Sequence, residues 1–449
     1  MIAQHDVIEF PSQQKLPEID VVFTGCRTGP NCYAFDIVDF RRRRVDRWQV
    51  PFIRNKHWAA EITAYMYPDE LPLGYKDSGL YCDDHYMTPH TVQLAPQGRL
   101  FAMFGVLENG FGILTIDTHS GEYEFVSGDG KASELFASTG DFDASFRHFY
   151  FATWPMTNTY SDAQKRLPNV LQIERIAIAN LERQLRYSAT EKIADDRVEG
   201  GALPRNLHQV TVSTDGRYVI CAPFTRAQTI SSRDEVSGAE AGKAKFKYMK
   251  VLENVITIDL KESRHWFTKI PVPVPAHIEF DLRHANIFYA SAHNIAGSAS
   301  GTILEGTATL FRLEIKDGKT EIVGSYTDSR LFRITQHTLF VHDNRILVAL
   351  TCVPNRLVIL DAETMTLWRD VELFEAEPIR ISNSGALSPE TSLTVYSLNP
   401  SSDGRFIVLE NASDFIVYDI AEDKVLDARI SRCIPRGYCG RGHTRSVGQ

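Results

Sequence analysis

Four histidines begin similar stretches of the chain and could together bind one metal ion. "HTVQLAPQGRLFAMFG" begins at His90, "HQVTVSTDGRYVICAP" at His208, "HIEFDLRHANIFYASA" at His277 and "HTLFVHDNRILVALTC" at His337. Neutral imidazole nitrogens bind zinc, copper and iron, with Zn–N distances of about 2.0–2.1 Å. A single histidine of this kind is more often bonded to water or to backbone. Four at matching places favour a metal site.

Each of these stretches has the pattern of a β-hairpin. Apolar and polar residues alternate after the histidine, and a turn such as Asp215-Gly216 separates two strand-like runs. Related hairpins begin at Thr139 ("TGDFDASFRHFYFATW") and at Tyr396 ("YSLNPSSDGRFIVLEN"). Two more such runs follow each hairpin, for example "NVITIDL" and "RHWFTKIPV". Four strands repeated about every 50 to 70 residues are typical of β-propeller blades.

The sequence therefore predicts an all-β protein: one seven-bladed β-propeller domain over residues 1–449, with four antiparallel strands per blade and a central axial site. We expect the blades at 5–52, 88–128, 137–195, 206–272, 275–328, 335–375 and 394–431, and a C-terminal tail at 432–449. The first blade shows three clear strands. Its missing inner strand is either "DVIEF" near the N-terminus or part of the tail. The "S-x-D-G-R" hairpins resemble those of the YVTN and WD-type propeller superfamily over most of the chain.

The first strand of a propeller blade lines the central channel, so equivalent residues at its beginning converge at one mouth of that channel. The longest connections lead into these inner strands or join a second strand to a third, and they belong to the same mouth. They are residues 53–87, 225–250, 292–306 and 376–394. Long loops gathered over one face are typical of a lid or a binding site.

Other side chains expected near this mouth are candidates for supporting the ion or the substrate. Tyr396 takes the histidine position of its blade, and it is either a proton donor or a channel tyrosine bonded to water. A carboxylate can orient a metal-bound imidazole through its second nitrogen. The remaining second-shell or substrate-binding candidates are Asp83, Asp84, His85, Thr139, His293 and Gln336.

The placing of His90, His208, His277 and His337 resembles the carotenoid cleavage oxygenases, which hold Fe(II) by four histidines on the axis of a seven-bladed propeller. The copper-containing, methanethiol-oxidase-like selenium-binding propellers are a second resemblance, in architecture alone. These resemblances imply one divalent ion with open positions for a small organic substrate, and dioxygen as a candidate co-substrate. Fe(II) is favoured, with Cu and Zn as alternatives because raw affinity favours them.

The leading expectation is a mononuclear metal-dependent oxidoreductase or oxygenase. A redox-neutral lyase, isomerase or cyclase, in which the ion polarises an oxygen, is the alternative enzyme class. A non-catalytic interaction scaffold is the third. The chain has no phosphate-binding loop, dinucleotide fingerprint, H-E-x-x-H or G-x-S-x-G motif that would indicate other chemistry.

Composition limits the partners and the compartment. The net charge of −9 argues against a nucleic-acid partner, because a duplex binder needs a basic surface. No apolar run reaches about 18 residues, so we expect no membrane span. The N-terminus, "MIAQHDVIEFPSQQ", lacks the basic and apolar regions of a secretory signal. We therefore expect seven reduced cysteines and a cytoplasmic location.

Overall fold

The computed structural model describes the strands and short turns of the chain. The described residues are 6–9, 21–24, 32–39, 44–51, 91–95, 98–107, 110–117, 120, 122–127, 135–136, 139–155, 169–191, 207–223, 254–271, 277–291, 309–328, 333–353, 355–375, 397–401, 403–410, 414–426, 430–431 and 443–446. Their regular structure is entirely β, and they include no helix of the length and apolarity that crossing a bilayer requires.

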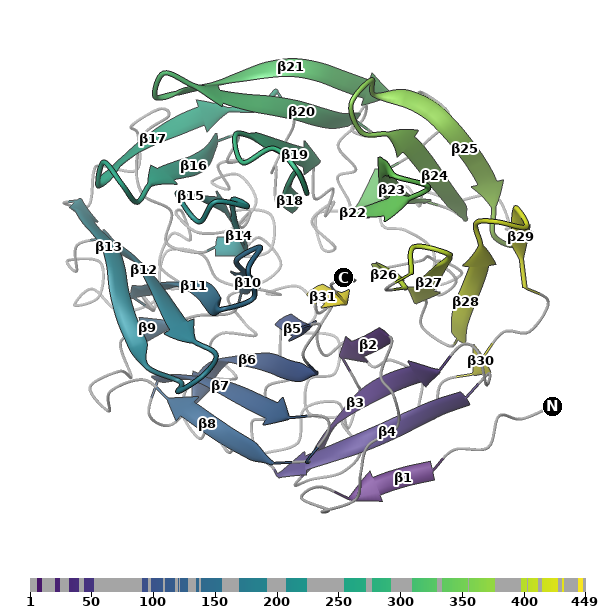
Figure 1. Cartoon of the computed structure of the whole chain (residues 1–449), viewed down its shortest axis with the longest axis horizontal. Helices are drawn as coiled ribbons and strands as arrows, with labels where there is room; N and C mark the ends of the chain where they lie inside the picture. The colour runs from purple at the N-terminus through teal and green to yellow at the C-terminus, as the bar shows by residue number, and fades with distance from the viewer. Residues whose placement is uncertain are drawn as a thin grey trace, which may run out of the picture.

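The sheets are arranged in a ring around one axis (Figure 1), so the predicted all-β propeller is confirmed. Six sheets contain four consecutive antiparallel strands. The first three are β5 (Thr91–Leu94), β6 (Arg99–Leu107), β7 (Gly110–Asp117) and β8 (Tyr123–Ser127); β10 (Gly140–Phe142), β11 (His148–Pro155), β12 (Asn169–Ala177) and β13 (Arg183–Glu191); and β14 (Leu207–Val212), β15 (Tyr218–Pro223), β16 (Asn254–Asp259) and β17 (Arg264–Lys269).

The other three sheets of this kind follow along the chain. They are β18 (His277–Phe280), β19 (Ile287–Ser291), β20 (Thr309–Lys316) and β21 (Lys319–Thr327); β22 (Arg333–His342), β23 (Arg345–Val353), β24 (Arg356–Asp361) and β25 (Thr366–Glu372); and β26 (Ser397–Pro400), β27 (Phe406–Glu410), β28 (Asp414–Asp419) and β29 (Lys424–Val425). Two short strands lie off these paths: β9 (Leu135–Phe136) pairs with β11, and β30 (Ile430–Ser431) pairs with β28.

The N-terminal sheet departs from the prediction of seven four-stranded antiparallel blades, and that number is corrected to six. Here β2 (Val21–Thr24), β3 (Cys32–Asp39) and β4 (Arg44–Pro51) are antiparallel, but β1 (Asp6–Glu9) pairs parallel to β4. "DVIEF" therefore contributes an added strand beside β4, not an inner one. The C-terminal tail instead supplies β31 (His443–Ser446), which pairs parallel to β5 and contacts β2 and β26.

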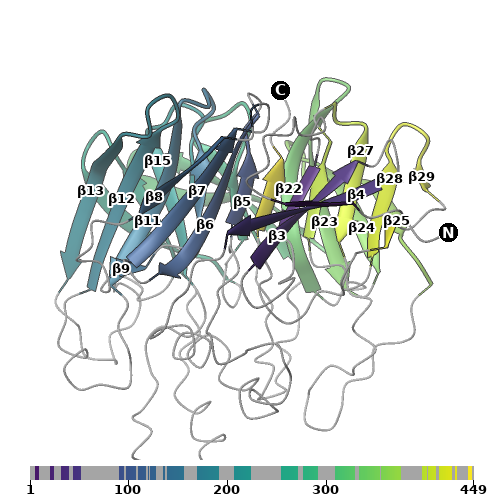
Figure 2. The same cartoon turned by 90° about the horizontal axis from the view of Figure 1, so that it is seen from below.

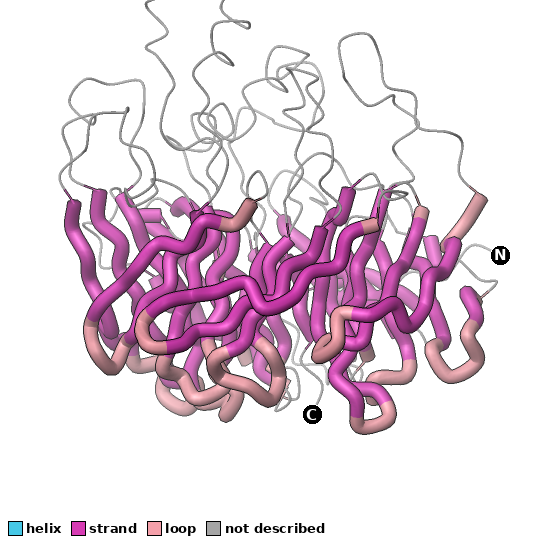
Figure 3. The backbone as a smooth tube through the Cα atoms, turned by 90° about the horizontal axis from the view of Figure 1, so that it is seen from above, coloured by secondary structure: helices cyan, strands magenta, loops and turns pink. Residues whose placement is uncertain are grey.

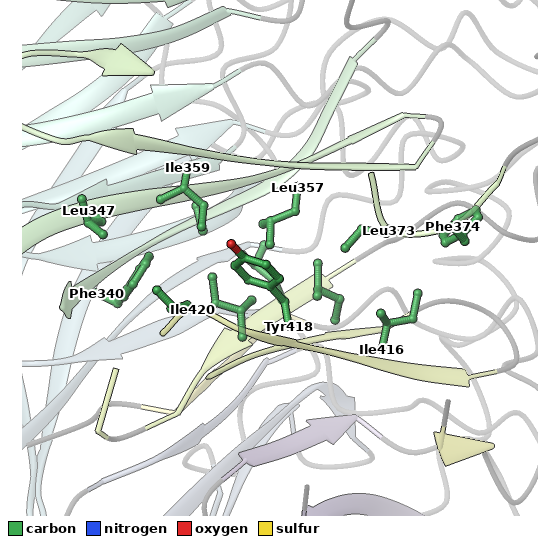
Figure 4. Close-up of a cluster of buried hydrophobic side chains, with 13 residues drawn as sticks. Phe340, Leu347, Leu357, Ile359, Leu373, Phe374, Ile416, Tyr418 and Ile420 are labelled. Atoms are coloured by element: carbon green, nitrogen blue, oxygen red, sulfur yellow. The ribbon is translucent and has the colours of Figure 1, made fainter. Parts of the chain in front are cut away.

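The hydrophobic cores lie between neighbouring sheets. In the cluster of Figure 4, Phe340, Leu347 and Ile359 of the β22–β25 sheet pack against Ile416 and Tyr418 of β28, and all are buried. Middle strands are buried on both faces, as the burial of Leu357 to Leu360 in β24 shows. Each sheet therefore buries its apolar residues only when its neighbours are in place.

Buried polar side chains join one inner strand to the next. The Asp141 carboxylate accepts hydrogen bonds from the Thr211 hydroxyl (2.7 Å) and the Val212 backbone N–H (3.4 Å). Glu279 accepts in the same way from the Thr338 hydroxyl (3.4 Å) and the Leu339 N–H (3.1 Å). Both acids are at least nine-tenths buried. Two further bonds continue the series: Gln93 Nε2 donates to the Gly140 carbonyl, and the Ile278 N–H donates to Gln209 Oε1.

The two ends of the ring differ in their connections. The short turns that follow the inner strands lie at one end, as the pink turns of Figure 3 show. Since strands alternate in direction, β15 ends and β16 begins at the opposite end, where β18 also begins at His277. Figure 2 shows the ring of strands from the side. The four predicted lid segments, 53–87, 225–250, 292–306 and 376–394, lie outside the described residues.

Replacing Glu279 tests the hydrogen bonds between inner strands. We expect Glu279→Ala to lower the free energy of unfolding by about 1–3 kcal/mol, because it leaves the buried Leu339 N–H and Thr338 hydroxyl without this acceptor. Denaturant unfolding measures the change. Glu321→Ala, at an exposed position of β21, is the matched control and should have almost no effect. Equal midpoints for the two variants would refute a stabilising role for Glu279.

Two glycines of the Asp-Gly turns allow a paired test of packing between hairpins. Gly216 and Gly404 both have positive φ (68° and 63°), which costs other residues about 1–2 kcal/mol. A Cβ at Gly404 would also clash with the Val341 carbonyl oxygen, whereas at Gly216 the nearest atom is Tyr150 Oη at 3.7 Å. We expect Gly404→Ala to be clearly more destabilising than Gly216→Ala in denaturant unfolding. Equal losses would show that the hairpins do not pack this closely.

Candidate axial site

Two of the four predicted ligands, His277 and His337, come together at the mouth end of adjacent inner strands. His277 is the first residue of β18 and His337 lies in β22, and each side chain is only 4% exposed. Their ring centroids are 6.5 Å apart, with an angle of 74° between the ring planes. Two buried imidazoles therefore approach each other across the junction of two sheets.

The register explains why these two rings meet. Ile278 and Phe280 pack against Ile220 of the preceding sheet, so His277, which alternates with Ile278, lies on the face toward β22. Leu339 packs against the β18–β21 sheet, and His337, two residues before it, shares that face. The two histidines thus lie on facing sides of the same junction.

This geometry corrects the expectation that the two histidines occupy equivalent positions. Thr338 bonds to Glu279 as Thr211 bonds to Asp141, so Thr338 and Thr211 are equivalent. Gln336 then matches Gln209, and His337 stands one residue further along. His277 matches Gln209 itself. His277 lies four residues before Asp281, and Gln209 lies four residues before Ser213, and the N–H groups of Asp281 and Ser213 close the turns that follow the two strands. An alignment that starts each hairpin at its histidine therefore misses this one-residue offset between His277 and His337.

His337 has the properties of a neutral nitrogen ligand. Burial lowers its pKa from 6.5 to about 3, so the imidazole is uncharged at neutral pH. Its Nδ1 lies 2.9 Å from the hydroxyl of buried Ser291, the residue paired with His277 across β18 and β19. Its Nε2 is buried and has no hydrogen-bond partner among the described residues. When Nδ1–H donates to Ser291, Nε2 presents a lone pair, as metal-bound histidines usually do.

The other predicted site residues have different outcomes. Thr139 is buried, and its hydroxyl accepts a hydrogen bond from the Val210 N–H (3.2 Å), which gives it a role between inner strands. Gln336 is also buried at the mouth end of β22. His208 lies in β14, beside its irregularity, and its side chain is outside the description. The candidates outside the described residues are Asp83, Asp84, His85, His90, His293 and Tyr396.

Among the described side chains, no three of His, Cys, Asp and Glu lie together as a metal site. The described part of the protein therefore contains the His277–His337 pair but no third ligand of these types. Two histidines at the opposite end of the ring, where the short turns lie, bond to carboxylates. His148 Nδ1 is 2.9 Å from Asp143, and His284 Nδ1 is 3.0 Å from Asp281.

Sequence reasoning missed one histidine near this mouth, His443. Its strand, β31, has only four residues, HTRS, and no apolar alternation that would have predicted a strand. The backbone pairing places His443 opposite Thr91. A histidine within the last residues of the chain gave no other signal.

Comparison with known proteins adds no family. No family model matches the chain, and no curated protein matches it. The resemblance to carotenoid cleavage oxygenases thus has no support from these comparisons.

The low pKa of His337 predicts how stability depends on pH. In metal-free protein, unfolded His337 takes up a proton below its ordinary pKa of 6.5, while the folded form resists protonation down to about pH 3. The contribution of this group to the free energy of unfolding is therefore full above pH 6.5 and falls as the pH drops from 6.5 toward 3. Denaturant unfolding at several pH values measures the slope.

The matched variants are His337→Gln and His284→Gln, the latter at a side chain that is 54% exposed. His337→Gln should flatten the fall in stability between pH 6.5 and 3, and His284→Gln should leave it close to the wild type. An unchanged slope in His337→Gln would contradict the burial of a neutral imidazole at this position.

Proposed function

We propose that the protein binds one divalent metal ion at the axial mouth and uses it as a mononuclear oxidoreductase or oxygenase on a small organic substrate. His277 and His337 would hold the ion together with His90 and His208, and Fe(II) is the favoured metal, with Cu or Zn as alternatives. Tyr396 would donate a proton to the substrate.

The observation that carries the proposal is the state of His337. Its imidazole is buried and neutral, it is oriented by Ser291, and its Nε2 has no hydrogen-bond partner among the described residues. The centroid of its ring is 6.5 Å from that of a second buried histidine, His277. Leaving a buried polar atom unsatisfied costs about 1–3 kcal/mol. A metal ion bound to Nε2 would remove that cost.

The fit to a metal is chemical. Neutral nitrogen ligands leave the charge of a divalent ion uncompensated, so the ion can activate a bound oxygen or polarise a substrate. Bound at the axis, the ion would supply this Lewis-acid or redox chemistry. The chain would contribute the neutral ligands and the hydrogen bond between the Ser291 hydroxyl and His337 Nδ1 that holds one ring in place.

Metal binding by purified variants tests the proposal. We expect His337→Ala and His208→Ala to lower affinity for the metal by at least about 10-fold, since a direct ligand should matter at least as much as a residue supporting one. His148→Ala and His284→Ala, whose imidazoles bond to Asp143 and Asp281 at the turn end, are the controls and should bind as the wild type does. Equal metal content in all four variants would rule out the axial metal site.

Oxygen uptake during turnover then separates the chemistries. Consumption of dioxygen that requires the metal supports the oxygenase. Turnover that requires the metal but consumes no dioxygen and no other oxidant would assign the redox-neutral lyase, isomerase or cyclase class instead.

A further inference from the structure

Five junctions between neighbouring sheets are built in the same way. Each has a core of buried apolar side chains, from the junction of the β5–β8 and β10–β13 sheets round to that of the β22–β25 and β26–β29 sheets. Side-chain hydrogen bonds join the same neighbours, beginning with Gln93 to the Gly140 carbonyl and ending with His342 Nδ1, 3.0 Å from the Gly404 carbonyl oxygen. Six sheets therefore form a continuous arc, and closing the ring requires contacts on the two sides of the β1–β4 sheet.

Strand β31 lies where those closing contacts are needed. It contacts β26, the inner strand at one end of the arc, and β2 of the β1–β4 sheet, and it pairs in parallel with β5 at the other end of the arc. Figure 1 shows β31 near the centre of the ring, between β26, β2 and β5. In addition, β2 contacts β5 directly and β30 contacts β4. At the axis, one strand thus bridges both sides of the β1–β4 sheet.

The β5–β8 sheet is a complete blade without β31. It has four consecutive antiparallel strands like the other five sheets of the arc, whose paths of described strands all begin with the inner strand. β31 is an added strand inside β5, and its ladder pairs only four residues, His443–Ser446, with Thr91–Leu94. A parallel ladder is also slightly less stable per residue than an antiparallel one. β31 therefore serves the junctions between sheets, and a short element of this kind opens before the sheets that it joins.

We propose that β31 is a strap that closes the ring and that detaches from β5, β2 and β26 while the arc of six sheets stays folded. Its release would part the β26–β29 sheet from the β1–β4 sheet and open the axial channel from the side. Closure by β31 depends on its backbone pairing and is independent of a metal ion at the axis.

Hydrogen exchange of the full-length protein, followed by mass spectrometry, tests the strap. Thr444→Pro combined with Arg445→Pro removes two successive backbone N–H groups of β31. Successive N–H groups of a strand point to opposite sides, so one of the two is on the side of β5. We expect amide exchange in β5, β2 and β26 to become about 10-fold faster, because loss of a ladder hydrogen bond favours the open state. The β14–β17 sheet, in the middle of the arc, should exchange as in the wild type.

The matched control is Thr444→Ala combined with Arg445→Ala, which keeps both N–H groups and should exchange as the wild type does. Faster exchange confined to β5 would overturn the strap, because β31 would then only cover the edge of one sheet. Equal acceleration in the β14–β17 sheet, or in the alanine variant, would overturn it too, since the effect would then be global or due to side chains. Unchanged exchange in β5 would overturn the pairing itself.

A cross-link should have the opposite effect. Thr444→Cys combined with Val92→Cys places two thiols at backbone-paired positions, within the reach of a disulfide. Oxidation should hold β31 on β5 and slow exchange in β2 and β26 relative to the reduced form of the same variant. Failure to form the disulfide, or equal exchange in the oxidised and reduced forms, would contradict closure by β31.

Discussion

Backbone N–H groups at the ring axis bond to buried side chains of the preceding inner strand. Asp141 and Glu279 make the clearest of these bonds, to Val212 and Leu339, and each also accepts from a threonine hydroxyl of the next strand. Such a bond fixes both the spacing of two sheets and the register of one inner strand against the next. Since a slip of one residue would turn every side chain of the strand to its other face, the composition of the channel depends on these bonds.

The candidate site is a consequence of that register. With Leu339 held by Glu279, His337 faces the β18–β21 sheet, where Ser291 bonds to its Nδ1. His277 lies on the face of β18 that is turned toward β22, and its ring approaches that of His337 at the junction of the two sheets. Burial keeps the pKa of His337 low, so that its imidazole remains neutral at physiological pH. The interactions that assemble the ring thus also leave His337 Nε2 without a hydrogen-bond partner among the described residues, the nitrogen on which the proposed metal site depends.

The sequence predicts the repeating strands well and their exact register less well. The Asp-Gly hairpins at Gly216 and Gly404 and the apolar middle strands are local patterns, which alternation and turn chemistry reveal directly. The one-residue offset between His277 and His337 depends instead on how each inner strand bonds to the preceding one, which no short pattern marks. Asp6–Glu9 and His443–Ser446 pair in parallel with distant segments, and such long-range pairings leave little trace in local sequence. The approach of His277 to His337 was predictable, whereas the strand His443–Ser446 was not.

X-ray absorption at the metal edge, together with elemental analysis of the purified protein, tests the central claim most directly. The account predicts about one equivalent of a divalent metal with imidazole nitrogens near 2.0–2.1 Å, and loss of that signature in His337→Ala. A protein that binds no metal when offered Fe²⁺, Cu²⁺ or Zn²⁺, or that binds one through oxygen and sulfur ligands alone, would contradict it.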